Sequence, residues 1–301
     1  MIEKVNQQDK KKKTNTAEKY SDIMKKSMDR AFRGGISGGI AMAINICTLM
    51  PLRTAVNYQY RYGTSGMQSL RTLYLDGGII RFYRGFSFAI IQGPWSRFGD
   101  TFANSGTLAL LNSMESTSDL NVGTKTLMAS SAASLFRVIS TPLDTCKTTL
   151  QVEGKTGLKK ISTKFRNAGG FPRGVPILWY GAMGSASATF VGHYPWFFTY
   201  NYLQDRIPEQ ETVLGNLSKN AFIGFSASAV SDTSSNSIRV LKTYRQTHPE
   251  KISYTSSIKE IISKDGVASL FGRGLKTKII SNGIQGSLFA VLWKYIEREI
   301  S

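Results

Sequence analysis

LMASSAASLFRVISTPLDTCKTTLQ, residues 127–151, is the stretch that decides the fold, because the same plan occurs twice more along the chain. Residues 34–56 read GGISGGIAMAINICTLMPLRTAV, and residues 222–246 read FIGFSASAVSDTSSNSIRVLKTYRQ. Each copy begins with small residues, passes a Pro or Ser, and ends in polar and basic residues. Self-similarity at a regular spacing is the sign of a repeat architecture. The sequence therefore predicts three tandem structural units.

Each copy continues in the same order through a basic loop, an aromatic–Gly motif and a second helix. The predicted helix hinges Pro51, Pro142 and Ser237 lie 91 and 95 residues apart. The closing glycines lie 96 and 93 residues apart, at Gly85, Gly181 and Gly274. We expect an all-α chain of three helical hairpins, six helices in total, with short helices in the loops. The predicted boundaries are a basic tail over 1–29 and repeats over 30–117, 118–210 and 211–301.

The composition argues against enzyme chemistry. The chain has two cysteines, Cys47 and Cys146, and two histidines, His193 and His248, with no HExxH-type pair. Neither cysteine belongs to a metal-ligand spacing pattern. Acidic residues are scattered, so no hydrolase centre or metal site is predicted. We expect a protein that is not an enzyme and holds no metal.

Hydrophobicity alone does not predict a membrane protein, since no stretch has eighteen clean apolar residues. A helix that lines a water-filled cavity escapes that requirement, because only its other face meets lipid. Small residues such as Gly34 and Gly38 let helices approach closely within lipid. A phosphate-binding loop is the alternative for GGISGG, but no strand precedes it and no Lys-Ser/Thr follows it.

The distribution of charge predicts a topology. The formal net charge of +18 first suggests nucleic acid or anionic lipid as partner. However, segments 53–84, 144–174 and 239–278 carry +4, +5 and +6, while 103–122 and 204–219 carry −2 and −1. The positive-inside tendency then gives six spans with both termini on the less positive side. Basic residues in three separate loops favour an anionic phospholipid partner over nucleic acid. The tail contains five acidic residues, which is unlike a mitochondrial presequence.

The second copy carries a recognisable signature: Pro142, Asp144, Lys147 and Gln151, followed later by an aromatic–Gly motif. This pattern resembles the repeat of the mitochondrial carrier family, and the resemblance covers roughly residues 30–300. It implies a pseudo-threefold barrel of six tilted helices in the mitochondrial inner membrane, with both termini toward the intermembrane space. It also implies a substrate site near mid-membrane between two salt-bridge gates that open alternately.

The gate expected on the matrix side departs from the family pattern. Arg53 stands where an acid is expected and Val56 where a base is expected, and Arg239 replaces the acid of the third repeat. If each acidic position faces the basic position of the next repeat, Arg53 faces Lys147 and Arg239 faces Val56. A like-charge contact at about 4 Å costs about 4 kcal/mol at an effective dielectric near 20, so this gate is not expected to close by the family's usual means. The implied gate residues, in which Asp144 and Lys242 keep opposite charges, are Arg53, Asp144, Lys147, Gln151, Arg239, Lys242 and Gln246.

Alignment of the second helices on Pro94, Pro195 and Gln285 gives the substrate-contact positions that the resemblance implies. These positions and the aromatic residues on the same helical face are Ile91, Gly192, His193, Asn282, Trp95, Trp196 and Tyr200. None carries a permanent charge, although His193 is able to change charge near neutral pH. Backbone bonding in the core is the alternative for the histidine, and helix packing is the alternative for the two tryptophans.

Two functional interpretations follow from these features. The first is transport of a small anionic or polar metabolite, with an aromatic part stacked on Trp196 and Tyr200. The second is a transport-inactive structural subunit with the carrier fold, bound in a larger inner-membrane complex. In both, the motifs that open the second helices resemble sites for cardiolipin, since free helix N–H groups and a cation bind phosphate. The lipid positions implied are Arg84, Gly85, Gly181, Arg273 and Gly274.

Overall fold

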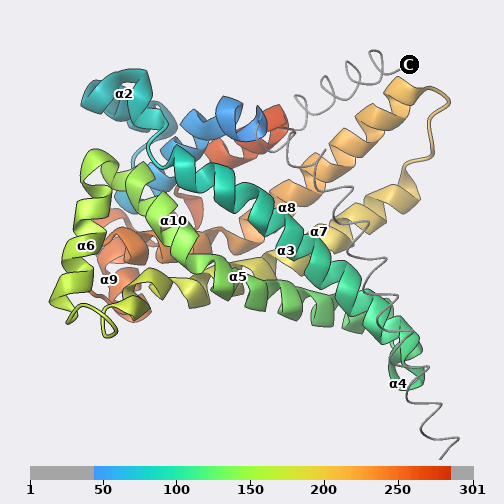
Figure 1. Cartoon of the computed structure of the whole chain (residues 1–301). Helices are drawn as coiled ribbons and strands as arrows, with labels where there is room; N and C mark the ends of the chain where they lie inside the picture. Colours follow the sequence, from blue (N-terminus) through green and yellow to red (C-terminus); the bar gives the residue numbers. More distant parts are fainter. Residues whose placement is uncertain (1–43, 286–301) are drawn as a thin grey trace, which may run out of the picture.

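The computed structural model describes residues 44–285, and within them the regular structure is helical, as expected (Figure 1). The tail over 1–29 and the outer ends of the first and third predicted repeats lie outside this range. The helices in chain order are residues 44–62, α2 (Gly66–Phe82), α3 (Phe86–Ser113), α4 (Glu115–Ser118), α5 (Val122–Glu153), α6 (Gly157–Asn167), α7 (Ala182–Arg206), α8 (Val213–Thr247), α9 (Tyr254–Asp265), α10 (Val267–Gly272) and residues 275–285. Two short 3-10 turns, Gly154–Thr156 and Val175–Trp179, flank α6.

Side-chain caps fix where several of these helices begin. Asn121 accepts a hydrogen bond from the backbone N–H of Thr124 at the start of α5, and Thr212 does the same for α8. Such caps satisfy backbone donors that have no partner inside the helix. The capped helices are long, with 32 residues in α5 and 35 in α8. At 1.5 Å per residue, α5 extends over about 48 Å.

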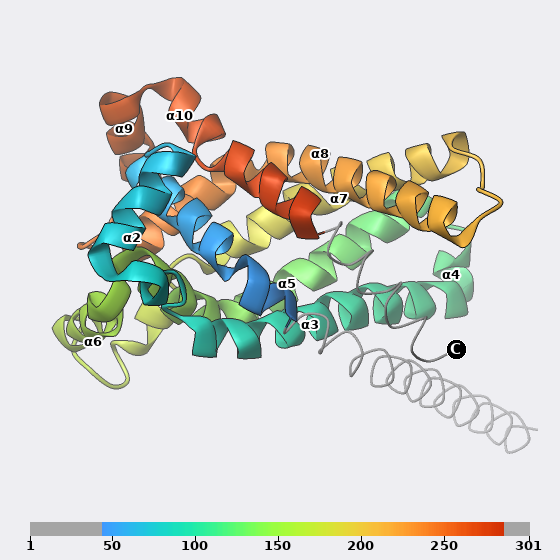
Figure 2. The ribbon, with the colours of Figure 1, turned by 90° about the horizontal axis from the view of Figure 1, so that it is seen from above.

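The long helices lie side by side, and the short ones gather at one end of the molecule. Figures 1 and 2 show α3, α5, α7 and α8 along a common direction, with α2, α6, α9 and α10 together at one end. The opposite end holds α4 and the link between α7 and α8. The three basic loop segments therefore share one end of the molecule, and the two acidic connections share the other.

Prolines lie inside the long helices and do not end them. Pro142 lies in α5, Pro94 in α3 and Pro195 in α7, while Pro51 lies within the helical residues 44–62. A proline has no N–H to donate, so each such helix lacks one backbone hydrogen bond there. Ser237 occupies the corresponding place in α8, which is continuous across it.

Polar side chains lie inside the bundle and many apolar side chains lie outside it. The buried residues of α5 include seven serines and threonines in addition to Asp144 and Gln151. Large apolar side chains of the long helices, such as Leu135, Phe198 and Phe222, are exposed. This distribution is the reverse of that in an ordinary globular domain. Within residues 44–285, no helix reaches both the length and the mean hydropathy of a membrane-crossing segment.

The three closing glycines have positive φ angles and each lies against a neighbouring helix. Gly85 has φ 85°, Gly181 has φ 124° and Gly274 has φ 66°. A Cβ atom on Gly85 would lie 3.0 Å from the Lys147 carbonyl oxygen, and one on Gly274 would lie 2.8 Å from the Tyr60 ring. Glycine is required for both the conformation and the close approach.

Candidate functional site

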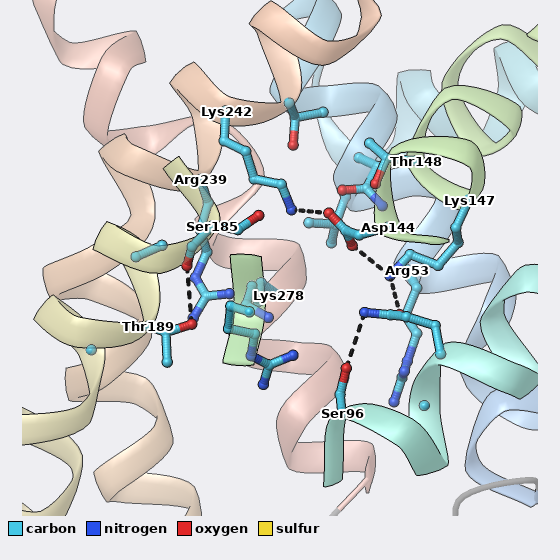
Figure 3. Close-up of a pocket in the computed structure, with 18 of the residues that line it drawn as sticks. Arg53, Ser96, Asp144, Lys147, Thr148, Ser185, Thr189, Arg239, Lys242 and Lys278 are labelled. Carbon is cyan, nitrogen blue, oxygen red and sulfur yellow. Dashed lines mark hydrogen bonds and ion pairs between the residues drawn. The ribbon is translucent and has the colours of Figure 1, made fainter. Parts of the chain in front are cut away.

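A cavity of about 680 Å³ lies between the long helices and is lined by charged and hydroxyl side chains (Figure 3). The lining comes from all the long helices, including residues 44–62 and 275–285. Six cations line it: Arg53, Arg137, Lys147, Arg239, Lys242 and Lys278. The carboxylates of Asp100 and Asp144 also line it, and Asp232 contacts two of the cations. Among residues 44–285, six cations thus line the cavity, against two lining carboxylates and the neighbouring carboxylate of Asp232.

Asp144 is the centre of the most buried charged cluster. Its carboxylate forms ion pairs with Lys242 of α8 and, at 3.0 Å, with Lys147 one turn further along α5. Lys147 Nζ also donates to Oε1 of Gln92 on α3 at 2.6 Å. A carboxylate with two cations and little solvent is held firmly, because removing one partner would leave buried charge uncompensated. This cluster joins α3, α5 and α8.

The structure places Arg239 differently from the sequence expectation, whereas Arg53 lies near Lys147 at the cavity (Figure 3). Arg53 Nη2 also donates to Oε1 of Gln285 at 3.4 Å. Arg239 does not face Val56: its guanidinium lies 3.9 Å from Oδ1 of Asp232 and its Nε donates to Ser235. The physical reason is the length of the Arg239 side chain, which lets its guanidinium reach acceptors on its own helix.

An apolar cluster occupies the place where a third ion pair would be expected. Val56 and Tyr60 pack against Val240 and Tyr244 of α8, together with Ile261 and Leu270. Tyr60 Oη donates to Oδ1 of Asn236 at 3.0 Å. Asn236 Nδ2 in turn donates to the carbonyl oxygens of Phe271 and Arg273. The junction of residues 44–62 with α8 therefore rests mainly on apolar packing, to which the Arg61 guanidinium adds a contact over the Tyr244 ring at 4.3 Å.

Amide side chains contribute to the other junctions. Gln151 Oε1 accepts from Asn57 Nδ2 at 2.6 Å, which joins α5 to residues 44–62. Gln246 Nε2 donates to Thr145 Oγ1 at 3.1 Å, which joins α8 to α5. Gln151 lines the cavity, whereas Gln246 lies behind it. Both glutamines of the predicted gate are thus buried links between helices.

The predicted substrate-contact residues divide into two groups. Gly192, His193, Trp196 and Asn282 line the cavity. Ile91 is 58% exposed, so its side chain lies away from the cavity.

The aromatic members of the prediction pack in different ways. Trp95 Nε1 donates to Ser140 at 3.1 Å, and its ring packs on Phe136. Tyr200 stacks on Trp196, with 5.0 Å between ring centroids. His193 Nδ1 lies 2.7 Å from the side-chain Oγ of Ser130, so its partner is a hydroxyl group and not the backbone.

Four charged residues at the cavity were missed by the sequence reasoning: Lys278, Asp232, and the ion pair of Arg137 with Asp100, whose charged atoms lie 2.6 Å apart. Lys278 lies one helical turn before Asn282, and residues four apart share a helix face. That spacing could have predicted that Lys278 faces the cavity. No sequence feature predicted the same of Asp232 and Asp100, because neither belongs to the repeat motif.

A cation from each short-helix segment binds carbonyl oxygens at the end of a neighbouring long helix. Arg81 donates to Gln151 and Val152 at the end of α5. Lys164 donates to Gln246 and His248 at the end of α8. Such contacts satisfy carbonyls that have no partner inside the helix.

Arg273 makes the third contact of this kind, to the carbonyls of Tyr60 and Arg61, and also pairs with Asp265. It is 5% exposed, so the guanidinium expected to meet a lipid phosphate is instead buried among these acceptors. Arg84 is only half-buried.

Comparison with known proteins gives two findings. A family model described as mitochondrial carrier protein matches residues 215–300. A protein named mitochondrial thiamine pyrophosphate carrier 1, from Meyerozyma guilliermondii, is 28% identical over 190 residues, which is 58% of this chain and 62% of that protein. The chain thus matches less than two thirds of that relative's length. Together with the signature of the second repeat, these matches show that part of the chain is similar to mitochondrial carrier proteins.

Proposed function

We propose that this chain transports a small anionic metabolite across the mitochondrial inner membrane by alternating access. The observation that carries the proposal is the cavity in which six cations face three carboxylates. Positive charge in a confined space raises the local concentration of anions and stabilises them once bound. A volume of about 680 Å³ suits a ligand of coenzyme or nucleotide size.

The inside-out distribution of side chains supports the membrane part of the proposal. Exposed apolar residues such as Ile139 and Phe190 cover the long helices, while serines and threonines fill the interior. We propose six spans in three repeats, with hinges at Pro51, Pro142 and Ser237 and both termini toward the intermembrane space. The gathering of the basic segments at one end supports this orientation.

The similar protein suggests a first substrate to test. Its name includes thiamine pyrophosphate, which combines a diphosphate with aromatic rings. We propose that a ligand of this kind places its anionic group among the cavity cations. Its ring would then stack near Trp196, His193 and the other proposed contact positions.

Multivalent anions provide the test of the anionic cavity. They are expected to raise the melting temperature of the purified protein more than monovalent salt of equal ionic strength does. The effect is expected to shrink in the double variant Arg53→Gln/Arg239→Gln, because two cavity cations are lost. Lys155→Gln/Lys159→Gln is the matched control, since it removes two exposed cations outside the cavity.

Uptake of labelled thiamine pyrophosphate into cardiolipin-containing vesicles then tests transport directly. If no anion gives a stabilisation that depends on the two arginines, and uptake is absent, the proposal fails. The alternative of a transport-inactive structural subunit then becomes the better interpretation. Stable co-purification with other inner-membrane proteins would support that alternative.

We also propose that cardiolipin binds where the second helices begin, near Arg84, Gly85, Gly181 and Gly274. The glycines begin or immediately precede the second helices, where several backbone N–H groups have no partner within the helix and suit a phosphate. Cardiolipin is expected to raise the melting temperature more than a neutral lipid, and less so in Arg84→Gln. Equal stabilisation by both lipids would contradict this site.

A further inference from the structure

Two clusters of charged residues at the cavity, one around Asp144 and one around Asp232, differ in how tightly they are held. Asp144 binds Lys147 at 3.0 Å and binds Lys242 directly. Asp232 is also flanked by two cations, but Lys278 Nζ lies at 3.6 Å and Arg239 Nη2 at 3.9 Å from its Oδ1. Charge-assisted hydrogen bonds are typically about 2.7–2.9 Å long. The second cluster is therefore loosely paired.

Asp232 is held chiefly by another residue. Its Oδ2 accepts a hydrogen bond from Asn282 Nδ2, so the amide fixes the carboxylate between the two cations. Asp232 itself is buried, with 8% of its side chain exposed, whereas Arg239 and Lys278 expose 34% and 25% of theirs. The lysines of the Asp144 cluster expose only 18% and 15%. An incoming anion therefore reaches Arg239 and Lys278 more readily than Lys147 and Lys242.

We propose that Arg239 and Lys278 form an anion subsite in which Asp232 is a resident counter-ion that sets the charge a ligand must carry. This inference rests on the proposed function and specifies the ligand of the same cavity. A monoanion competes poorly, because Asp232 already supplies one negative charge to both cations. A ligand with two adjacent anionic groups, such as a diphosphate or a dicarboxylate, gains enough attraction to bind beside Asp232.

The position of the cluster supports a role in ligand selection. Arg239 and Asp232 come from α8, and Lys278 and Asn282 come from residues 275–285, so the subsite joins two elements. Figure 3 shows Arg239 and Lys278 of this set. Asn282 was already predicted as a substrate-contact position. Its bond to Asp232 connects that position to the counter-ion.

The test measures binding of inorganic pyrophosphate, malonate and acetate to the full chain in detergent by calorimetry. Asp232→Asn is expected to strengthen pyrophosphate and malonate binding about tenfold, because one repulsive charge is removed. It is also expected to let acetate bind measurably. Lys278→Gln is expected to weaken pyrophosphate and malonate binding about tenfold, and Asp232→Glu to remain near wild type. Glu209→Gln, which removes an exposed carboxylate outside the cavity, is the control and is expected to change nothing.

The outcomes separate this inference from the proposed function. If Arg53→Gln weakens pyrophosphate binding but Asp232→Asn and Lys278→Gln do not change it, the subsite is overturned and the anionic cavity stands. If neither pyrophosphate nor malonate binds to wild type, both proposals fail. If Asp232→Asn does not fold, Lys278→Gln decides the matter, because it keeps Asp232 paired with Arg239. Unchanged affinity in that variant overturns the subsite.

Discussion

Two junctions hold α8 against neighbouring helices, one mainly through an ion pair and the other mainly through apolar packing. On one side, α8 meets α5 through the ion pair of Lys242 with Asp144. On the other side, α8 meets residues 44–62 mainly through an apolar cluster that includes Val240 and Val56, with a hydrogen bond from Tyr60 and the Arg61 guanidinium over a tyrosine ring of α8. Neighbouring helices can thus be joined at equivalent positions either by directional charges or by non-directional burial. Loss of a motif charge therefore does not mean that a junction is open.

The largest expected effect comes from reversing the charge at the ionic junction. Asp144→Lys places a third cation beside Lys147 and Lys242 in a buried site. Breaking a buried pair in this way typically costs about 3–5 kcal/mol. We expect a marked loss in melting temperature and in folded yield. Adding Lys242→Asp should recover part of the loss, and a double-mutant cycle with strictly additive effects would contradict the pairing.

A smaller effect is expected at the apolar junction. Val240 is fully buried, so Val240→Ala removes two methyl groups and leaves a small cavity. We expect a loss of about 1–3 kcal/mol in the free energy of unfolding, measured by denaturant titration in detergent. The exposed Val230→Ala in the same helix is the control and should cost much less. Equal losses at both positions would show that the cluster does not hold the junction.

The smallest effect concerns Lys164, which binds carbonyls at the end of α8 from the short-helix end of the molecule. Burial lowers the pKa of Lys164 from 10.5 to about 8. Between these values the unfolded chain binds more protons than the folded one, so this group makes stability rise as pH rises from 8 to 10.5. The difference in melting temperature between wild type and Lys164→Gln should change in that window. A difference that is independent of pH would contradict the shifted pKa.

The sequence was informative where a position is set by backbone geometry. Gly85, Gly181 and Gly274 recur because only glycine combines positive φ with contact against a neighbouring helix. Asp144 and Lys242 were expected to form an ion pair, and they do. Each lies a few residues after a hinge position, Pro142 or Ser237, in a long and regular helix.

The sequence was less informative about the partners of long, flexible side chains that can reach several acceptors. Arg239 was expected to face Val56, yet it turns to Asp232, and Arg53, which lies near Lys147, also reaches Gln285. Val56 was interpreted as a lost base, although in the structure it is a core residue. A motif assigns a residue type to a position, but the partner of a flexible cation depends on acceptors that belong to no motif.

The bond of Arg273 with Tyr60 has a consequence for how the chain is made. These residues are 213 positions apart, and the bond between Tyr60 and Asn236 spans 176 positions. The helix of residues 44–62 can therefore form these contacts with α8 and Arg273 only after most of the chain has been synthesised. Contacts of such long sequence separation form late in folding. Apolar packing between residues 44–62 and α8 suits this late step, because apolar surfaces can dock and adjust without prior alignment of charges.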